Sequence, residues 1–493
     1  MICVPITETT AAAFLAAIDE ALPLADAIEL RLDYLPPEEL NDVLAALAAR
    51  PELAAYALIF TFRPREQGGQ RDLTLNDRIA FWRDLNPDLI TLHTLVDLEI
   101  DLVEKLIAEG SPIPWDNIIC SYHDFTGTPA DLNPMLTRLK RTPARAVKIA
   151  TLVRHPTDCL RLFEVVDRAG SRPVIALGMG MPGLPTRILA VSRGAMLTFG
   201  ALRAGAESAS GQPTVVELRE LYHLKTLTRK SEIYGVVGYP IGHSLSPKMH
   251  NAAMMAAGRD AVYMPFEVEK NLEGFIRDMV HPRTRRLDWN IRGLSVTIPH
   301  KLEVMKYLDE VDPLAREIGA VNTIAVEAGR LCGYNTDITG AMKPLDAIFD
   351  VRGARVAVLG GGGAARAICH GLVKRGAAIK LYGRDVEKLK PLAEELDLLT
   401  APLWSFTGVA DVVVNCTPVG MHGHSEERSP LPRWSLDGVK LVYDLVYNPV
   451  ETVLLRDARR MGCKMLGGGA MLEAQAAEQY RLWTGEESVN YAC

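Results

Sequence analysis

A lysine, Lys148, stands in the middle of a strand-like apolar run, Ala146–Leu152 (AVKIATL). An ammonium group in such surroundings costs several kcal/mol unless it is paired or loses its proton. A neutral amine can attack a ketone and form an imine, so Lys148 is a candidate nucleophile. The alternative interpretation is an edge strand from which the side chain reaches into water.

Other polar residues lie inside or at the ends of neighbouring apolar runs. Glu29 and Arg31 alternate within one run and therefore share a face, whereas Arg63 and His123 end two others. Positive neighbours would favour the neutral form of the Lys148 amine, because like charges repel. We expect three arginines to act in this way: Arg31, Arg63 and Arg187.

A glycine-rich turn joins a tight apolar run, Arg355–Leu359, to a helical stretch, Ala365–Lys374; its glycines are Gly360, Gly361, Gly362 and Gly363. The backbone N–H groups of such a turn point at an anion at the positive end of the helix, as in dinucleotide-binding units. After the next strand, Arg384 and Lys388 favour the 2'-phosphate of NADP, whereas the adjacent Asp385 favours NAD.

These residues need strands that bring their ends together. Up to about residue 228, short apolar runs alternate with stretches of helical periodicity such as Glu39–Leu47 and Asp158–Asp167. Eight such units predict a (β/α)8 TIM barrel, in which the carboxyl ends of the strands form the mouth of the active site. The predicted strands are Ile2–Ile6, Ala27–Leu32, Ala57–Phe62, Leu89–Leu92, Asn117–Ser121, Ala146–Leu152, Pro173–Leu177 and Ala195–Gly200.

The chain, at 493 residues, is too long for one hydrophobic core. A polar stretch, Leu224–Glu232 (LKTLTRKSE), lacks a strand pattern, and the strand–helix alternation restarts at Ile233. We therefore predict an α/β protein in several parts. These are a barrel over 1–224, a linker over 225–232, a substrate-binding lobe over 233–340 that is completed by 468–493, and a Rossmann lobe over 341–467.

Composition narrows the class of protein. The chain is 48% hydrophobic and 23% charged, with a net charge of -7 and scattered arginines, which argues against a nucleic-acid partner. No apolar run approaches the roughly 20 residues that span a bilayer, and the first residues do not resemble a signal peptide. The eight cysteines show no zinc-ligand spacing, so we expect reduced thiols, no metal and a cytoplasmic location.

Six segments occur in the order IELRLDYL, FTFRPREQGG, SYHDF, VKIA, LGMGMPGLPTR and SASGQ across about 1–225, and together they resemble the type I 3-dehydroquinate dehydratase family. The resemblance implies that Lys148 forms a Schiff base with the substrate ketone. His123 would shuttle protons and protonate the departing hydroxyl, and Arg187 would clamp the substrate carboxylate. The substrate hydroxyls would be held by Glu29, Arg31, Arg63, Ser208 and Gln212.

The second half contains GYPIGHSLSPKMH, GLSVTIPHK, GAVNT, GYNTD, VNCTPVGM, YDLVYNP and GGGAMLEAQ, which resemble the shikimate dehydrogenase family over about 233–493. The resemblance implies a catalytic pair, Lys301 and Asp337, in which the lysine gives a proton to the alkoxide that hydride transfer creates. Outside these motifs, either residue would be read as a solvated surface group. The implied substrate contacts are Ser244, Ser246, Thr297, Asn322, Tyr447 and Gln475; the implied cofactor contacts are Gly360, Gly361, Gly362, Gly363, Ala364, Arg366, Arg384, Lys388, Thr417, Leu445 and Gly468.

Four short segments depart from the usual family patterns. Gln67 stands directly before Gly-Gly, where the first family usually has glutamate. In the predicted fourth strand, Thr91 and His93 stand where that family has an acidic pair, and we expect His93 to be a hydrogen-bonded barrel histidine. Ser295 replaces the usual asparagine of Asn-Val-Thr, and Gly383-Arg384-Asp385 replaces the Asn-Arg-Thr of many NADP sites.

The two resemblances name consecutive steps of one pathway. They predict a bifunctional lyase and oxidoreductase that acts on 3-dehydroquinate, 3-dehydroshikimate and shikimate with NADPH, without nucleic-acid or membrane partners. Two alternatives stay open: a dehydrogenase that uses quinate and NAD in the degradative direction, and a non-catalytic metabolite sensor. A sensor would be expected to have lost Lys148, His123, Lys301 or Asp337, and all four are present. The oligomeric state is left open.

Overall fold

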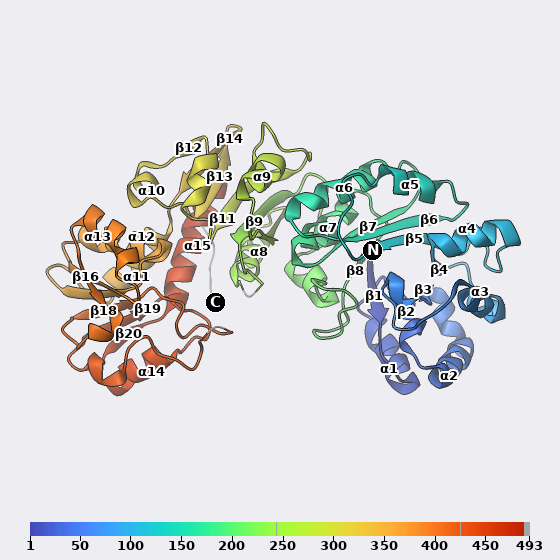
Figure 1. The fold of residues 1–493 in the computed structure, drawn as a ribbon, viewed down its shortest axis with the longest axis horizontal. Helices are drawn as coiled ribbons and strands as arrows, with labels where there is room; N and C mark the ends of the chain where they lie inside the picture. The colour runs from blue at the N-terminus through green and yellow to red at the C-terminus, as the bar shows by residue number, and fades with distance from the viewer. Residues whose placement is uncertain (243, 424, 488–493) are drawn as a thin grey trace.

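The structure is a computed structural model that describes residues 1–242, 244–423 and 425–487. Two halves of the chain lie side by side, with the barrel on the right of Figure 1 and two further sheets on the left. Cys493 and the end of the predicted segment 468–493 lie outside the described residues. None of the described helices is both long and apolar enough to cross a bilayer.

The first half is a nearly closed barrel of parallel strands, which confirms the predicted fold. Its eight strands follow the order β7-β6-β5-β4-β3-β2-β1-β8. Beside the gap between β7 and β8, Met196 N–H donates to Val174 O at 2.8 Å. The strands are β1 (Ile2–Ile6), β2 (Ala27–Arg31), β3 (Ala57–Thr61), β4 (Thr94–Glu99), β5 (Ile118–Asp124), β6 (Ala146–Leu152), β7 (Val174–Met179) and β8 (Thr198–Phe199).

The fourth strand was predicted in the wrong place. The run Leu89–Leu92 begins at the last residue of a short 3-10 turn, Pro87–Leu89, and Leu92 is 82% exposed. The strand is instead β4, in which Asp97 and Glu99 interrupt the apolar pattern and both are buried. Because two acids stand at alternate positions, a search for apolar runs selects the preceding loop. His93 is correspondingly exposed, so its predicted place inside the barrel is wrong.

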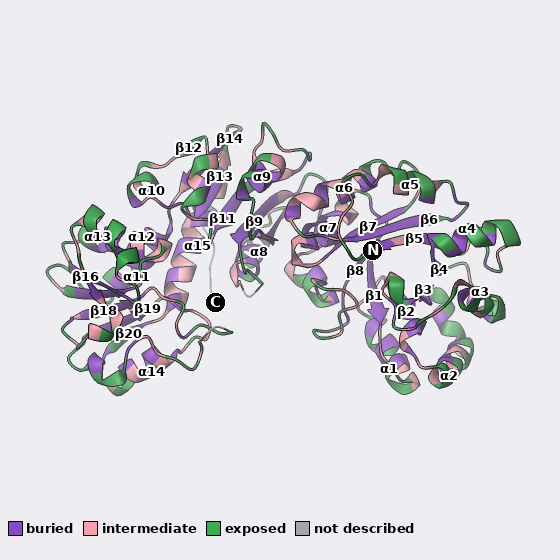
Figure 2. Cartoon of the chain, in the orientation of Figure 1, coloured by how far each residue is buried: buried purple, intermediate pink, exposed green. Residues whose placement is uncertain are grey.

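Helices cover the outside of the barrel, as their half-buried, half-exposed faces in Figure 2 show. Helix α3 begins with a capping box, in which the Thr74 hydroxyl accepts from Asp77 N–H and the Asp77 carboxylate accepts from Thr74 N–H. The helices are α1 (Ala11–Ala21), α2 (Pro37–Ala48), α3 (Leu75–Asp84), α4 (Ile100–Glu109), α5 (Asn133–Lys140), α6 (Cys159–Asp167) and α7 (Leu184–Leu189).

The first lobe of the second half is a mixed sheet with the strand order β10-β9-β11-β13-β14-β12. Its first strand begins at Glu232, the last residue of the predicted linker, and Leu227 just before it is buried. The strands are β9 (Glu232–Gly238), β10 (Ala261–Glu267), β11 (Asn290–Val296), β12 (Glu310–Val311), β13 (Thr323–Glu327) and β14 (Arg330–Tyr334); the helices are α8 (Ser246–Ala256), α9 (Leu272–Phe275) and α10 (Pro313–Ile318).

The second lobe is a parallel sheet with the order β17-β16-β15-β18-β19-β20, a doubly wound arrangement. Helices α11 (Asp337–Asp346) and α15 (Gly468–Thr484) pack against each other and connect the two lobes. The strands are β15 (Arg355–Leu359), β16 (Ala378–Gly383), β17 (Leu399–Pro402), β18 (Val412–Asn415), β19 (Leu441–Asp444) and β20 (Lys464–Leu466); the remaining helices are α12 (Gly363–Val373), α13 (Lys390–Leu396) and α14 (Val453–Arg460).

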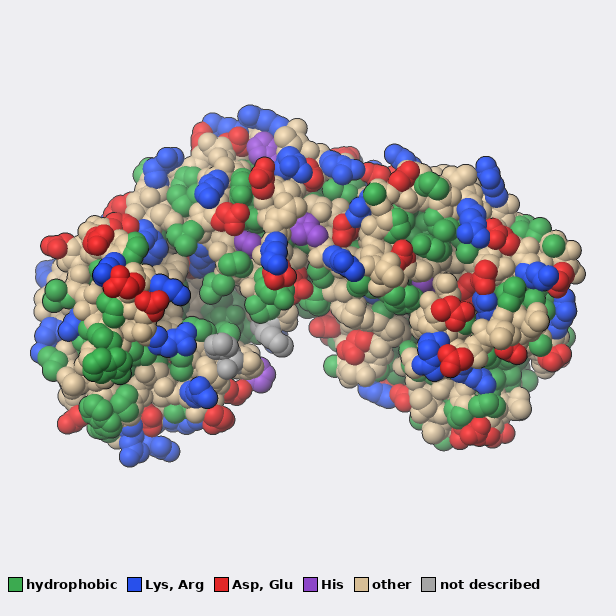
Figure 3. Space-filling model, in the orientation of Figure 1, with side chains coloured by type: hydrophobic (Ala, Val, Ile, Leu, Met, Phe, Trp, Pro, Cys, Tyr) green, Lys and Arg blue, Asp and Glu red, His purple; other side chains and the backbone are tan. Residues whose placement is uncertain are grey.

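The barrel and the first lobe share a packed boundary. The Phe163 ring on α6 meets the Trp289 ring edge-on, with centroids 6.1 Å apart. Arg193 donates to Asp288 O at 2.8 Å, and Arg286 pairs with Glu164 at 3.2 Å. Figure 3 shows charges of both signs interspersed over this face, and a broad notch below the boundary between the halves.

Two candidate active sites

Lys148 points into the barrel from β6, between β5 and β7, and is 4% exposed. Its Nζ donates to Asp97 Oδ2 at 2.7 Å and lies 3.8 Å from Glu29 Oε1. The Phe199 ring covers the amine at 4.5 Å. These contacts exclude the interpretation of β6 as an edge strand. The sequence predicted arginines as the charged neighbours of the amine, but the charged groups in contact with it are carboxylates.

A chain of alternating charges leads outward from Lys148. Arg63 joins Asp97 (2.7 Å) to Glu99 (3.1 Å), and Arg78 joins Glu99 (2.9 Å) to the partly exposed Asp101. Burial disfavours the Asp97 carboxylate, but Arg63 and Lys148 outweigh it and hold the Asp97 pKa far below its usual range. Burial raises the pKa of Glu99. The amine therefore faces a carboxylate that stays ionised.

Asp97 and Glu99 are the residues that the sequence reasoning missed in the barrel. The sequence analysis placed Thr91 and His93 where the family has an acidic pair in its fourth strand. That departure is wrong, because the fourth strand is β4 and carries Asp97 and Glu99. The spacing of the two acids, on one face of a strand, was the available signal. Gln67 stands at the end of a 3-10 turn, Arg65–Gln67, beside the loop of Gly68 and Gly69.

His123 projects from β5 on the same face as Lys148, because Ser121 pairs with Lys148 and His123 with Ala150. Both ring nitrogens are buried and find no hydrogen-bond partner among the described residues. Burial, followed by the charges of Arg63 and Lys148, holds the His123 pKa well below its usual value. The imidazole is therefore neutral, and its two nitrogens have no partner among the described residues.

Arg187 on α7 is a buried cation without an acidic partner. Its Nε donates to Gly178 O at 3.1 Å, and no carboxylate lies within 4.0 Å among the described residues. Burial lowers its pKa to about 10. A buried guanidinium without a counter-ion is suited to a bidentate contact with a carboxylate from outside the chain.

The other predicted barrel residues divide into two groups. Arg31 is held by buried Asp33 through two hydrogen bonds of 3.0 and 2.8 Å, and Glu29 accepts from the Thr61 hydroxyl at 2.8 Å. Ser208 Oγ donates to Gln212 Oε1 at 3.0 Å, while Gln212 Nε2 is buried without a partner among the described residues. That unpaired amide is a donor available to a bound hydroxyl.

In the second half, the structure brings Lys301 and Asp337 together. Lys301 follows β11, Asp337 opens α11, and Nζ lies 2.5 Å from Oδ2. Asn322 Nδ2 donates to the other carboxylate oxygen, Oδ1, at 2.8 Å, and so orients it. The carboxylate also lies in the first turn of a helix, where the helix dipole favours negative charge.

A hydrogen-bonded chain backs this pair, and sequence reasoning missed Gln479 at its centre. Tyr263 Oη donates to Ser295 Oγ (2.8 Å), which donates to Gln479 Oε1 (2.9 Å). Gln479 Nε2 donates to Thr323 Oγ1 at 3.0 Å. Ser295, which replaces the usual asparagine, is thus fully engaged. Gln479 lies on α15 outside every quoted motif. Its partners Ser295 and Thr323 are distant in sequence, so no local pattern marks it.

The predicted substrate residues lie around this chain and on neighbouring elements. Ser246 begins α8, and its N–H donates to Ser244 Oγ at 3.3 Å. Thr297 follows β11 and Tyr447 follows β19. Gln475 lies on α15 against Gly340 of α11, where an added Cβ would be 2.6 Å from the Gln475 Cβ. These residues come from both lobes and from the connecting helix α15.

The glycine-rich turn fits an anion-binding role. Gly360 has a φ of 110°, a conformation that glycine adopts without strain, and an added Cβ would lie 3.3 Å from Thr417 Cγ2. A Cβ at Gly362 would meet nothing within 4 Å, so the turn is open to a ligand there. A Cβ at Gly363 would lie 3.3 Å from Lys301 Cδ, which places the turn against the lysine.

The remaining cofactor candidates differ in how many contacts they make within the protein. Arg384 and Lys388 are exposed after β16, and Lys388 lies 3.8 Å from Asp385. Arg366, in contrast, donates to Ile318 O and to Glu395. Thr417 Oγ1 donates to Asn415 Oδ1 at 2.7 Å, and Gly468 packs so tightly that a Cβ would be 2.3 Å from the Leu445 carbonyl oxygen.

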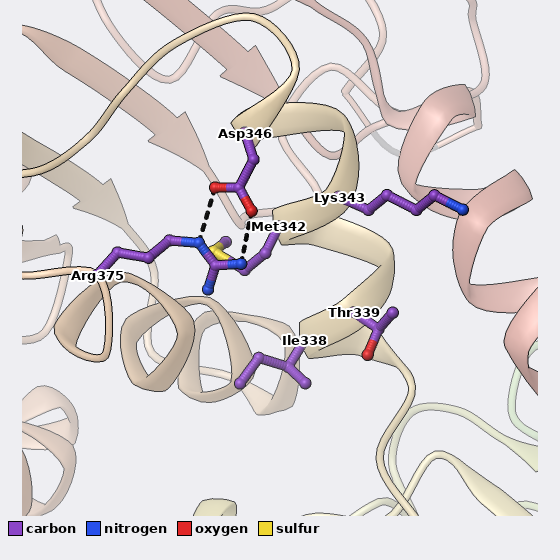
Figure 4. Close-up of a pocket in the computed structure, with 6 residues that line it drawn as sticks. All are labelled: Ile338, Thr339, Met342, Lys343, Asp346 and Arg375. Atoms are coloured by element: carbon purple, nitrogen blue, oxygen red, sulfur yellow. Dashed lines mark hydrogen bonds and ion pairs between the residues drawn. The ribbon is translucent and has the colours of Figure 1, made fainter.

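A hollow of about 440 Å³ lies elsewhere, along α11 and α12 (Figure 4). Ile338 and Met342 line it, and Asp346 bridges to Arg375 through two hydrogen bonds of 2.7 and 2.6 Å. It contains none of the predicted site residues. Its ion pair braces the far ends of α11 and α12, so we assign it a structural role.

Comparisons with known proteins match the two halves separately and the whole chain together. The family described as type I 3-dehydroquinase matches residues 2–229. The shikimate dehydrogenase substrate binding domain matches residues 236–324, and the family described as NADP oxidoreductase coenzyme F420-dependent matches residues 355–426.

A chloroplastic bifunctional 3-dehydroquinate dehydratase/shikimate dehydrogenase from Arabidopsis thaliana is 32% identical, with 98% of this chain and 82% of the relative covered. A shikimate dehydrogenase (NADP(+)) from Pyrococcus furiosus is 42% identical over 52% of this chain and 92% of its own. The crystal structure of shikimate 5-dehydrogenase from Thermus thermophilus with NADP(H) and shikimate is 35% identical, with a TM-score of 0.47, and covers 52% of this chain and 95% of its own.

Proposed function

The chain belongs to the family of bifunctional 3-dehydroquinate dehydratase/shikimate dehydrogenases, and we propose that it converts 3-dehydroquinate to shikimate in two steps. The barrel dehydrates 3-dehydroquinate to 3-dehydroshikimate, and the two-lobed half reduces that product. The boundaries that we propose are 1–224, a linker over 225–232, lobes over 233–340 and 341–467, and a returning segment over 468–493. One observation carries the proposal: each half holds one lysine against an aspartate.

In the dehydration, Lys148 attacks the substrate ketone and forms a Schiff base. The amine must give up a proton first, and the neutral imidazole of His123 lies on the adjacent strand to accept it. His123 returns that proton to the hydroxyl that leaves as water when the imine forms. The imine withdraws electrons and so acidifies the neighbouring carbon, and the neutral His123 takes the proton from that carbon and gives it to the departing hydroxyl. Water adds to the imine at the end and releases Lys148.

Substrate placement in the barrel depends on Arg187 and on the polar residues near the mouth. Arg187 is the proposed partner of the substrate carboxylate because it is buried, cationic and lacks an acidic neighbour among the described residues. Gln212 offers a buried amide N–H to a hydroxyl. We propose that Glu29, Arg31, Arg63 and Ser208 complete the hydroxyl contacts, with Arg31 and Arg63 already oriented by their carboxylate partners.

In the reduction, Lys301 gives its proton to the oxygen of 3-dehydroshikimate as the carbonyl becomes an alcohol. Asp337 holds the ammonium in place, and Asn322 fixes the carboxylate through its second oxygen. We propose that the substrate is bound by Ser244, Ser246, Thr297, Asn322, Tyr447 and Gln475. NADPH, when bound, supplies the hydride. It would be held by Gly360, Gly361, Gly362, Gly363, Ala364, Thr417, Leu445 and Gly468, with Arg384 and Lys388 at its 2'-phosphate.

A coupled assay tests the proposal. Purified protein should dehydrate 3-dehydroquinate, seen as absorbance of the conjugated enone, and should oxidise NADPH in stoichiometric amounts when the cofactor is added. Asp385 beside Arg384 supports a second candidate, an NAD-dependent dehydrogenase that acts on quinate. Faster oxidation of quinate with NAD than of shikimate with NADP would favour that candidate. The absence of dehydration would contradict the first step.

The compartment is a separate proposal. Seven cysteines within the described residues carry free thiols, and most are buried, which is typical of proteins in a reducing compartment such as the cytoplasm. The Arabidopsis relative is chloroplastic by its name. Cell fractionation with an antibody to this chain would decide between the two locations.

A further inference from the structure

Arg366, one residue beyond the first turn of α12, reaches across to the other lobe. Its Nε donates to Ile318 O at 2.7 Å, at the end of α10. A Cβ at Gly319 would lie 3.0 Å from Nη2, so the guanidinium lies directly over that backbone. Glu395 of α13 accepts from Nη2 at 2.6 Å and completes the contacts. Family resemblance alone assigns Arg366 to the cofactor, but its Nε and Nη2 donate to groups within the protein.

The segment that Arg366 holds, Ile318–Asn322, also holds the reacting pair. Val321 N–H donates to the Lys301 carbonyl oxygen at 2.8 Å. Asn322 Nδ2 donates to Asp337 at 2.8 Å. A shift of this short segment would therefore move the lysine and the aspartate together.

The other end of the same linkage is the glycine-rich turn. Gly363 opens α12 and lies against the aliphatic part of Lys301, where an added Cβ would be 3.3 Å from Cδ. Arg366 follows Gly363 on the same helix and is about one turn away. Through Arg366, the turn and the segment Ile318–Asn322 are thus fixed relative to each other.

Charged neighbours orient Arg366 and add a second link between the lobes. His370 Nε2 lies 3.1 Å from Glu395 Oε1, and its Nδ1 lies 3.6 Å from Glu317 Oε1 on α10. Lys374 pairs with the same glutamate at 2.9 Å. His370 is almost fully buried, so this network is more constrained than an isolated surface pair.

We propose that Arg366 is a positioning residue of the reduction, which holds Lys301 and Asp337 in register with the turn where the nicotinamide cofactor binds. This inference rests on the proposed reduction. It predicts that Arg366 affects hydride transfer and proton donation rather than the affinity for the cofactor. A misplacement near 1 Å in such a site costs on the order of 100-fold in rate.

The test compares Arg366→Gln, Glu395→Gln and their combination. With saturating NADPH and 3-dehydroshikimate, Arg366→Gln should lower kcat roughly 10- to 100-fold. The kinetic isotope effect with NADPH deuterated at the transferred position should rise, because hydride transfer becomes rate-limiting. The dissociation constant of NADPH, measured by its fluorescence, should change less than about threefold. Glu395→Gln should shift kcat and the isotope effect in the same direction, and the double variant should be no worse than Arg366→Gln.

Arg375→Gln is the matched control. It removes a two-bond ion pair with Asp346 at the opposite end of α12, away from the segment Ile318–Asn322. Its isotope effect should equal that of the unsubstituted chain. The dehydratase rate of each sample reports whether the chain has folded, and if Arg366→Gln is unfolded, Glu395→Gln decides, because Glu395 is partly exposed.

Two results would overturn the inference. The first is a dissociation constant for NADPH at least about tenfold higher with kcat unchanged at saturation, which would make Arg366 a cofactor ligand. The second is a lower kcat with an unaltered isotope effect, which would indicate a smaller folded fraction only. Failure of the proposed function looks different, because the unsubstituted chain itself would then not reduce 3-dehydroshikimate.

Discussion

Lys148 and Lys301 both touch an aspartate, yet their side chains are placed for opposite tasks. The Lys148 side chain is 5% exposed, lies inside a nearly closed barrel and has Glu29 as a second carboxylate within 4 Å. Lys301 is 16% exposed, at the boundary of two lobes, and contacts a glycine-rich turn. In the proposed function, Lys148 must give up its proton to become a nucleophile, whereas Lys301 must keep its proton until an alkoxide forms.

Trapping the imine tests the role of Lys148. Borohydride added with 3-dehydroquinate should reduce the Schiff base and attach the substrate covalently, which mass spectrometry of a peptide digest would detect at Lys148. Lys148→Ala should abolish the adduct. Lys105→Ala on α4, which removes an exposed lysine paired with Glu109, should leave it unchanged. An undiminished adduct in Lys148→Ala would disprove the assignment.

The pH dependence of dehydration tests the state of His123. Because its pKa in the folded chain is well below the usual value near 6.5, kcat/KM should show no fall centred on pH 6.5, and the acidic limb should lie lower. Below about pH 6.5 the imidazole of His123 takes up a proton in the unfolded chain but not in the folded chain. The free energy of unfolding should therefore fall by about 1.4 kcal/mol for each pH unit below 6.5. In His123→Asn that contribution should disappear. A titration of the His123 ring near pH 6.5, followed by NMR, would contradict this account.

At the scale of elements, β4 and α3 act as one unit. β4 presents Asp97 and Glu99 to the barrel interior, and α3 supplies Arg78, which neutralises Glu99 from the outside. The Lys148 amine is thereby linked, through ion pairs, to a residue on a covering helix. This long-range arrangement explains why the barrel tolerates five buried charged groups next to one another, from Lys148 to Arg78.

Arg78→Met should leave Glu99 buried with Arg63 as its remaining partner. Removing one member of a buried pair is strongly destabilising, and we expect about 3 kcal/mol less stability to denaturant, together with slower dehydration. Reduction should be retained. Arg83→Met, on the same helix but in an exposed pair with Glu109, should change stability by less than about 0.5 kcal/mol. Equal effects of the two substitutions would refute a special role for Arg78.

Local patterns predicted the elements that have a regular hydrophobic period, and failed where charged residues are buried. The strand before the glycine-rich turn, Arg355–Leu359, and the strand around Lys148 have the predicted bounds. β4 was misplaced because Asp97 and Glu99 are stabilised by Arg63 and Arg78, which are distant in sequence. Gln479 was missed because its hydrogen-bond partners, Ser295 and Thr323, are also distant in sequence.

At the scale of the whole molecule, the halves share a hydrophobic contact rather than a flexible tether. Trp289 packs between Phe163 of the barrel and Phe266 of β10, with centroids 6.1 Å from each, and its Nε1 donates to Met279 O at 2.7 Å. The segment between the halves is partly buried at Leu227. We therefore expect the two halves to unfold together.

Trp289→Ala should separate their unfolding. Truncation of a buried tryptophan lowers the free energy of unfolding by about 3–5 kcal/mol. Here it would weaken the first lobe and its contact with the barrel. Calorimetry should show one transition for the unsubstituted chain and two for the variant. Trp404→Ala, which removes a side chain that is 86% exposed, should leave the single transition unchanged. A single unshifted transition in Trp289→Ala would mean that the boundary contributes little.

If one chain holds two lysine-based sites that work independently, a single coupled assay should separate them. With 3-dehydroquinate and NADPH, Lys301→Ala should still accumulate 3-dehydroshikimate but should not oxidise NADPH. Lys148→Ala should oxidise NADPH only when 3-dehydroshikimate is supplied. Loss of both activities in either folded variant, or retention of both, would show that the two lysines do not serve separate sites.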